Sequence, residues 1–155
     1  MVIQIDTHEK KKAIVKIVEE FNRQGVKHIN SKLYVGDYMS LDNAKFVIDR
    51  KQNLLEICNN VCQDHKRFIN ELRRANDLGV RLVFLIEHSS KIKSLEDVKE
   101  WVNPRLKKYP LAVSGQRLYE KLSVLEKTFN TKFYFCSKAE TGKKIIELLG
   151  DNDGK

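Results

Sequence analysis

Residues 36–51 read GDYMSLDNAKFVIDRK, and this stretch organises the chain around it. The aromatic and β-branched residues 46–48 are typical of a strand, and polar, turn-forming residues precede them. We therefore predict a β-hairpin with a first strand over residues 26–39 and a return strand over residues 44–51. Three charged residues directly follow the apolar part of the return strand, which indicates a core strand whose tip opens into a cleft.

Two carboxylates of the predicted hairpin can share one face of the sheet. Asp37 lies opposite Asp49 if the turn is centred on Asn43. Because side chains alternate along a strand, Lys51 shares the face of Asp49 and Arg50 points the other way. That face then holds two carboxylates and one ammonium. The alternative is purely structural, with all of these charges directed into water.

The composition is that of a soluble globular chain, with 41% hydrophobic and 32% charged residues among 155. No apolar run approaches the ~18 residues that a membrane-spanning helix needs. The amino terminus does not have the pattern of a signal peptide. We expect a cytoplasmic protein (nuclear if eukaryotic) without a membrane partner. Zinc spacing and a disulfide framework are both absent, so we expect three reduced core thiols, at Cys58, Cys62 and Cys136.

The charge is strongly positive. Lys and Arg number 29 and Asp and Glu number 21, a net charge of +8, which favours a nucleic acid partner. The candidate DNA contacts are Arg50, Lys10, Lys11, Lys66, Arg67, Arg73, Arg105, Lys107 and Lys108. The lysines at 10–12 are equally well explained as a solvated charge run, and Arg50 is either structural or a phosphate contact.

The rest of the chain alternates between strand and helix patterns. We predict a strand at 2–5, a helix that Thr7 caps and Gly25 ends, the hairpin, helical residues 54–75, a strand at 82–86, a short helix from Ser94, a helix from Ser114, a strand at 132–136 and a last helix around 145–149. This order predicts an α/β fold with a mixed sheet covered by helices on both faces. Residues 1–150 form one domain, and residues 151–155 form a flexible tail.

Apolar residues recur at helical spacing over residues 54–75 and form an apolar stripe, which leaves two points open. It is one long helix or two helices with a break near Asn59 and Asn60. His65 lies on the apolar side of the stripe, which favours a partly buried core histidine over a ligand.

The acidic residues suit a hard divalent cation, because such cations prefer oxygen ligands. Asp37 and Asp49 are the first candidates. Asp6 and Glu9 follow the first strand, and neighbouring strands lie only ~4.8 Å apart, so they can add further carboxylates. Their alternative is a role as helix-start acids that the dipole favours, which fits Glu9 better than Asp6. Lys51 can orient an attacking water or contact a phosphate.

Three motifs together resemble the nuclease domain of the XPF family of structure-specific endonucleases, a PD-(D/E)XK, restriction-enzyme-like group. They cover residues 1–90 in order: Asp6-x-x-Glu9, Gly36-Asp37-Tyr38 and Asp49-Arg50-Lys51. The resemblance implies a restriction-endonuclease-like fold and Mg²⁺ or Mn²⁺ on Asp37 and Asp49. It also implies Lys51 as the catalytic lysine, with Asp6 and Glu9 as supporting acids. The nearest likeness is to small stand-alone phage and bacterial versions.

The chain departs from the family pattern at three positions. Asp49 replaces the usual glutamate, His8 stands where arginine is frequent, and Leu55 stands where the family has an aspartate. The tandem helix-hairpin-helix module, which many relatives use for DNA binding and dimerisation, is also missing. A homodimer and a preference for branched, flap or nicked DNA are therefore open expectations. The leading hypothesis is a metal-dependent DNA endonuclease of repair or recombination. The alternative is a non-catalytic DNA-binding module or partner subunit on the same fold.

Overall fold

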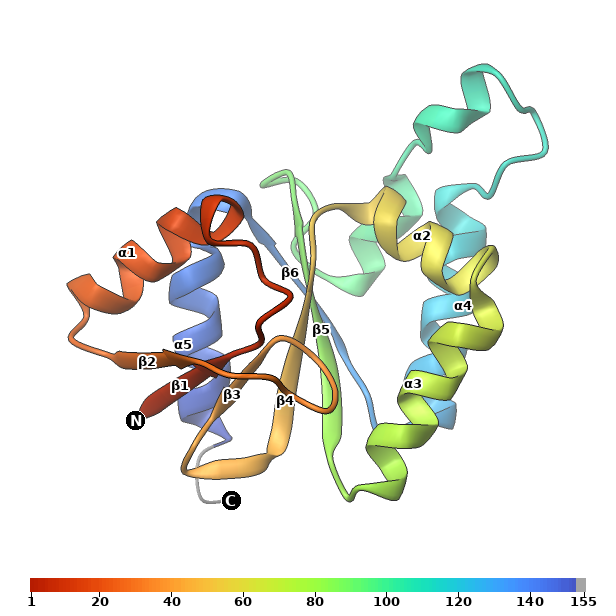
Figure 1. The fold of residues 1–155 in the computed structure, drawn as a ribbon. Helices are drawn as coiled ribbons and strands as arrows, with labels where there is room; N and C mark the ends of the chain where they lie inside the picture. Colours follow the sequence, from red (N-terminus) through yellow and green to blue (C-terminus); the bar gives the residue numbers. More distant parts are fainter. Residues whose placement is uncertain (153–155) are drawn as a thin grey trace.

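The computed structural model describes residues 1–152, whose centre is one six-stranded mixed sheet (Figure 1). The strand order is β2-β1-β3-β4-β5-β6. Only β3 runs antiparallel to its neighbours β1 and β4, while the other pairs are parallel. The strands are β1 (Val2–Ile5), β2 (Lys27–Asn30), β3 (Tyr38–Ser40), β4 (Asn43–Lys51), β5 (Arg81–His88) and β6 (Phe133–Ser137).

Helices cover both faces of the sheet, which confirms the predicted α/β fold (Figure 1). The α-helices are α1 (Val15–Arg23), α2 (Leu54–Cys62), α3 (His65–Asp77), α4 (Gly115–Thr128) and α5 (Thr141–Asp151). Short 3-10 helices are η1 (Lys11–Ile14), η2 (Leu95–Glu100), η3 (Pro104–Lys107) and η4 (Lys138–Glu140). One core cluster joins the sheet to α2, α3, α4 and η2, and the other joins it to α1 and α5.

The continuous apolar run of β5 is explained by its central place. Leu82, Phe84 and Ile86 pack into the cluster under α2–α4, and Val83 and Leu85 pack into the cluster under α1 and α5. All five side chains are buried. A strand covered on both faces needs apolar residues at every position, as the sequence predicted.

The predicted first strand of the hairpin, over residues 26–39, is wrong. Its beginning forms β2, which pairs in parallel with β1 at the sheet edge, and only β3 pairs with β4. Between them the chain turns at Gly36, whose φ is +69°. A Cβ atom there would lie 2.4 Å from Val47 Cγ1, so glycine is required both by the turn and by the close approach.

The pairing of β3 with β4 keeps the predicted register at the end next to Asp37 and Asp49. Tyr38 pairs with Ile48 and Met39 with Val47, which is the register of a turn centred on Asn43. Near the turn the register shifts, and Ser40 pairs with Asn43. The irregularity makes the turn tighter than predicted without moving Asp37 away from its place opposite Asp49.

The start of the first helix and the break in the long helix were also misplaced. Thr7 lies in a turn and does not cap a helix, because η1 begins only at Lys11 and α1 at Val15. The break lies at Gln63 and Asp64, between α2 and α3. His65 is consequently exposed at the start of α3, and its Nδ1 lies 3.1 Å from the Val61 carbonyl oxygen.

Several smaller expectations have clear outcomes. The segment that Ser94 caps is a 3-10 helix rather than an α-helix, and its capping box with Asp97 is present. The predicted tail from residue 151 is wrong for its first residue, since α5 extends to Asp151. Residues 153–155 lie outside the described part. Over residues 1–152 the three cysteines are unpaired thiols, and none of the helices has the length and apolar character needed to cross a membrane.

Candidate active site

The hairpin brings Asp37 and Asp49 together at the end of β3 and β4 that lies away from the turn. The Asp37 backbone N–H donates to the Ile48 carbonyl oxygen at 2.8 Å. In return, the Arg50 backbone N–H donates to Asp37 Oδ2 at 2.7 Å. These two bonds hold Asp37 opposite Asp49, whose residue is only 6% exposed. The sequence expectation that these two carboxylates lie together is met by the structure.

The two carboxylates are difficult to ionise together. Burial, then the charges of Asp49 and Glu9, raise the pKa of Asp37 to about 9. Burial also raises the pKa of Asp49, and the neighbouring Glu71 adds to this, although Lys51 opposes it. A pair of acids in this condition gains from any cation that binds between them.

Lys51 is the cation that the fold itself supplies. Its Nζ lies 3.1 Å from Asp49 Oδ1 and 5.8 Å from the centre of the Phe84 ring. Burial alone would lower the pKa of Lys51, but the charges of Asp49, Glu71 and Glu56 raise it. Lys51 therefore remains an ammonium at neutral pH and can donate hydrogen bonds but cannot accept a proton.

Arg50 points to the other face and serves a structural network. Its Nε donates to Glu9 Oε2 at 2.8 Å, and a second nitrogen forms a buried ion pair with Glu87. The Tyr38 hydroxyl donates to Glu9 Oε2 at 2.7 Å. The Arg50 residue is 9% exposed, so it has almost no surface left for DNA, and the structural alternative describes it better.

Asp6 lies beside the carboxylate pair in space, since its backbone N–H donates to the Asp37 carbonyl oxygen at 2.8 Å, but its own carboxylate is already hydrogen-bonded. Its Oδ1 accepts from the Leu33 backbone N–H at 2.7 Å, and its Oδ2 accepts from the His8 backbone N–H at 3.0 Å. The His8 ring adds a contact of 2.9 Å. Burial raises the pKa of Asp6, but these bonds outweigh it and lower the pKa overall. Asp6 thus braces the loops around the site.

The described residues contain no group of three or more His, Cys, Asp or Glu side chains arranged for a metal. The expected participation of Asp6 as a third metal ligand therefore finds no support in the geometry. Glu9, bound to Arg50 and Tyr38, acts on Asp37 through its charge. Of the four acids that the sequence predicted, Asp37 and Asp49 are therefore the two that the geometry leaves for a cation.

Pockets along helix α3 reach Lys51, the neighbour of Asp49. A pocket of about 210 Å³ is lined by Lys51, Asn60, Asp64, Arg67, Phe68 and Glu71. A larger pocket of about 570 Å³ continues along the helix, with Gln63, Asp64, Lys66, Arg67, Asn70, Glu71 and Arg74 as its lining. Asp64, Arg67 and Glu71 line both pockets. The two pockets therefore form one groove, which we call the α3 groove.

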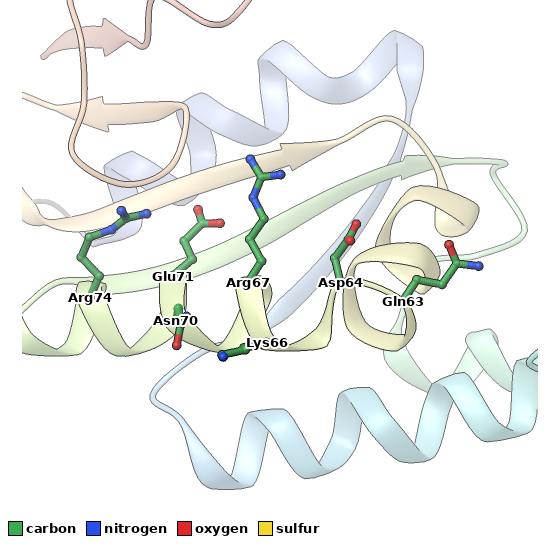
Figure 2. A pocket seen from close by; sticks show the side chains of 7 residues that line it. All are labelled: Gln63, Asp64, Lys66, Arg67, Asn70, Glu71 and Arg74. Carbon is green, nitrogen blue, oxygen red and sulfur yellow. The ribbon is translucent and has the colours of Figure 1, made fainter.

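Figure 2 shows how the α3 groove presents its side chains. Arg67, Glu71 and Arg74 project from one side of α3, whereas Lys66 and Asn70 project from the other. Positions 67, 71 and 74 repeat at helical spacing, so they share a face. The groove therefore carries a guanidinium group on either side of the Glu71 carboxylate, whose charge raises the pKa of Asp49.

The predicted DNA contacts are divided among three elements. Lys66 and Arg67 line the α3 groove. Arg73 is exposed but does not line the groove, whereas its neighbour Arg74 does. The exposed Lys10 and Lys11 lie at η1. The remaining three predicted contacts lie in and after η3: Arg105, Lys107 and Lys108.

Sequence reasoning missed Glu71, Glu87 and Arg74 as residues of the site. Glu71 and Arg74 have a sequence signal, because they flank the buried positions Phe68 and Leu72 of an amphipathic helix. That signal tells which face of α3 is polar but not which strand the face adjoins. Glu87 has no such signal, since it reads as the polar end of a buried strand.

Comparison with known proteins identifies the family. A family model described as the ERCC4 domain matches residues 5–149. The chain belongs to the ERCC4 domain family. No curated protein matches this ERCC4 domain. The predicted resemblance to the XPF family is thereby confirmed.

Solved structures show where the fold of this ERCC4 domain recurs. XPF from Aeropyrum pernix is similar over 100% of the chain, with a TM-score of 0.70 and 16% identity. XPF from the same organism in complex with DNA is similar over 96% of the chain, with a TM-score of 0.68 and 17% identity. The ERCC4 domain described here spans 66% and 63% of those two chains. These likenesses confirm the restriction-endonuclease-like α/β fold.

Proposed function

We propose that this ERCC4 domain is a metal-dependent DNA endonuclease that hydrolyses phosphodiester bonds in branched, flap or nicked DNA. The observation that carries the proposal is the convergence of Asp37, Asp49 and Lys51 at one end of the hairpin. The α3 groove, which is lined by Lys51 at one end, gives a cationic approach to this residue. Membership of the ERCC4 family and the existence of a similar XPF in complex with DNA support the proposal.

The carboxylate pair fits Mg²⁺ or Mn²⁺. Mg²⁺ is usually held by one or two carboxylates, with waters and substrate phosphates as its other ligands. Asp37 and Asp49 supply these two carboxylates, and their raised pKa values mean that they gain most from a cation. A bound ion of this kind polarises a phosphodiester and lowers the pKa of a bound water.

The ammonium of Lys51 has two tasks in this proposal. One of its protons is directed to Asp49, which fixes the orientation of that carboxylate. The other protons are free to donate to a phosphate oxygen, where they would stabilise the charge that develops during hydrolysis. Because its pKa is raised, Lys51 acts as an electrostatic donor and not as a general base.

The α3 groove suits the strand that leads to the scissile phosphate. Arg67 and Arg74 are seven residues apart, about 10 Å along the helix axis, so they would contact different phosphates. Guanidinium groups bind phosphate oxygens in a bidentate manner. Glu71 lies between them (Figure 2), so its carboxylate would repel phosphate from the middle of the groove.

Cleavage of matched DNA substrates tests the proposal. Linear, nicked, flap and four-way DNA are incubated with the protein in Mg²⁺, in Mn²⁺ and in excess EDTA. We expect cleavage of the interrupted substrates in either metal and none in EDTA. Asp37→Ala and Lys51→Ala should melt cooperatively but not cut, whereas the control Lys45→Ala, an exposed lysine of the same strand, should cut normally.

Three results would overturn the proposal. Cutting in EDTA would exclude the metal, and cutting by Asp37→Ala would exclude the carboxylate pair. If the wild-type protein binds branched DNA but cuts none of the substrates in either metal, the chain is a DNA-binding module on a nuclease fold. A role in DNA repair or recombination in a bacterial or phage-infected cytoplasm belongs to the same proposal and rests on the family resemblance.

A further inference from the structure

Residues 102–113, which we call the arm, stand out from the body of the molecule between η2 and α4 (Figure 1). The base of the arm is closed by Asn103, whose Nδ2 donates to the Val113 carbonyl oxygen at 2.9 Å. Its Oδ1 accepts from the Arg105 backbone N–H at 3.0 Å. Asn103 is 2% exposed, so the two ends of the arm are tied together by a buried side chain.

The root of the arm is packed tightly as well. A Cβ atom on Gly115, the first residue of α4, would lie 2.4 Å from the Trp101 carbonyl oxygen and 2.6 Å from that of Val98. Within the arm, the Tyr109 backbone N–H donates to the Arg105 carbonyl oxygen at 2.8 Å. A loop that is closed at its base and turned on itself is a defined projection, comparable to the compact surface loops that frequently have a function.

The arm presents apolar side chains to solvent. Leu111 is 93% exposed, Val102 is 74% exposed and Tyr109 is 54% exposed. The Arg105 guanidinium lies 5.4 Å from the centre of the Tyr109 ring. Exposed apolar groups gathered on one projection mark a surface that another molecule covers.

The charge of the arm indicates which molecule this is. Residues 101–119 contain four cations and no Asp or Glu, so their surroundings favour a polyanion. Lys107 and Lys108 are exposed beside Tyr109. An aromatic ring among cations is the arrangement on which nucleic acid bases stack while the phosphates are held by the charges. Apolar side chains can also insert at steps where base stacking is weak.

We propose that the arm recognises interruptions in duplex DNA by contacting the base faces that they expose. Tyr109 and Leu111 contact the unstacked base at a nick, flap or junction, and Lys107 and Lys108 hold the neighbouring phosphates. Between its ends an intact duplex has no free base face, so along the duplex the arm contributes contacts only at an interruption. This inference rests on the proposed function, because it assigns to the arm the recognition of the DNA that the site would cut.

The arm is well placed for this role. It rises from the end of the sheet at which β4 ends and α2 begins, and α2 follows Lys51 closely in the chain (Figure 1). An interruption held by the arm would therefore lie on the same side of the molecule as the carboxylate pair. The arm and the α3 groove then act on different parts of one substrate.

Equilibrium binding without cleavage tests the inference. The Kd of the full chain for a linear duplex and for a flap of the same length is measured in EDTA by fluorescence anisotropy. We expect Tyr109→Ala/Leu111→Ser to weaken flap binding roughly tenfold, the usual effect of losing base stacking, and to leave duplex binding unchanged. Both side chains are exposed, so the melting temperature should not change.

Two further variants make the test specific. Tyr109→Phe keeps the ring and should bind the flap as the wild type does. Val124→Ser removes an exposed apolar residue of α4, 60% exposed and outside the arm, and should have no effect. A 2-aminopurine at the base of the flap should be quenched by the wild type but not by the double variant, because only a stacked probe is quenched.

The inference is overturned if the double variant binds both DNAs as the wild type does, or loses both equally. It is also overturned if the double variant loses only binding to phosphatidylserine vesicles, because the arm would then recognise a lipid surface. The outcome is separable from that of the nuclease proposal. If the arm is needed to prefer flap over duplex DNA but the protein never cuts, only the nuclease proposal is refuted. If the protein cuts and the double variant still prefers flap DNA, only the proposal for the arm is refuted.

Discussion

Replacement of Asp37 by Asn should stabilise the metal-free protein at alkaline pH. In the folded state the pKa of Asp37 is raised to about 9, whereas in the unfolded chain an aspartate has a pKa of about 3.9. The stability that the protonated group contributes is therefore fully present below about pH 4 and is lost as the pH rises through about 9. Asparagine has the same shape, accepts the Arg50 N–H bond and never ionises, so it avoids this loss.

Burial is the larger cause of the raised pKa of Asp37, and the repulsion between the two carboxylates gives the part of the effect whose size can be worked out. Residues directly opposite in an antiparallel pair lie about 5 Å apart, and two unit charges at that distance repel by about 3 kcal/mol at an effective dielectric constant of 20. We expect Asp37→Asn to raise the free energy of unfolding by about 2–3 kcal/mol at pH 9 in EDTA. For a chain of this size that corresponds to a rise in Tm of about 4–12 °C.

Thermal melting by circular dichroism, at pH 4 and pH 9 in EDTA, measures this effect. At pH 4 the wild type and Asp37→Asn should melt together, because Asp37 is protonated there. Asp42→Asn, which neutralises the exposed carboxylate at the turn of the same hairpin, is the matched control and should shift Tm little at either pH. A Tm difference that is equal at both pH values, or a variant that is less stable at pH 9, would refute the reasoning.

Three other predictions follow from single contacts. Arg50→Met should lower the free energy of unfolding by about 3–5 kcal/mol in urea titrations, because it leaves two buried glutamates without their cation. Gly36→Ala should cost at least about 1 kcal/mol in the same assay, since alanine is strained at positive φ and its Cβ would overlap Val47, and an unchanged midpoint would argue against the turn geometry. Glu71→Gln removes a charge that raises the pKa of Asp49, so the acid limb of the cleavage–pH profile should move to lower pH; a move to higher pH would contradict the contact.

The centre of the site could be predicted from the sequence because local rules determine it. Side chains alternate along β4, so Asp49 and Lys51 had to share a face and Arg50 had to leave it. The pairing of Asp37 with Asp49 needed only the hairpin register, which the turn residues and the apolar run indicate. The distribution of apolar residues likewise identified β5 as a central strand.

The surroundings of the site could not be predicted because they depend on distant contacts. The Asp6 carboxylate accepts a hydrogen bond from the backbone of Leu33, 27 residues away in the chain. The Arg50 side chain is held by Glu87, 37 residues away. Glu71 approaches Asp49 only because α3 packs on this face of the sheet. No periodicity or spacing in the sequence indicates these contacts between residues that are far apart in the chain.

Calorimetric titration of Mn²⁺ at pH 8 tests most directly whether Asp37 and Asp49 share one divalent cation. The wild type should bind the ion, Asp37→Asn and Asp49→Asn should each lose that binding, and Asp6→Asn should retain it because Asp6 serves the loops and not the ion. Undiminished binding in either of the first two variants, or its loss only in Asp6→Asn, would show that the carboxylate pair is not the metal site.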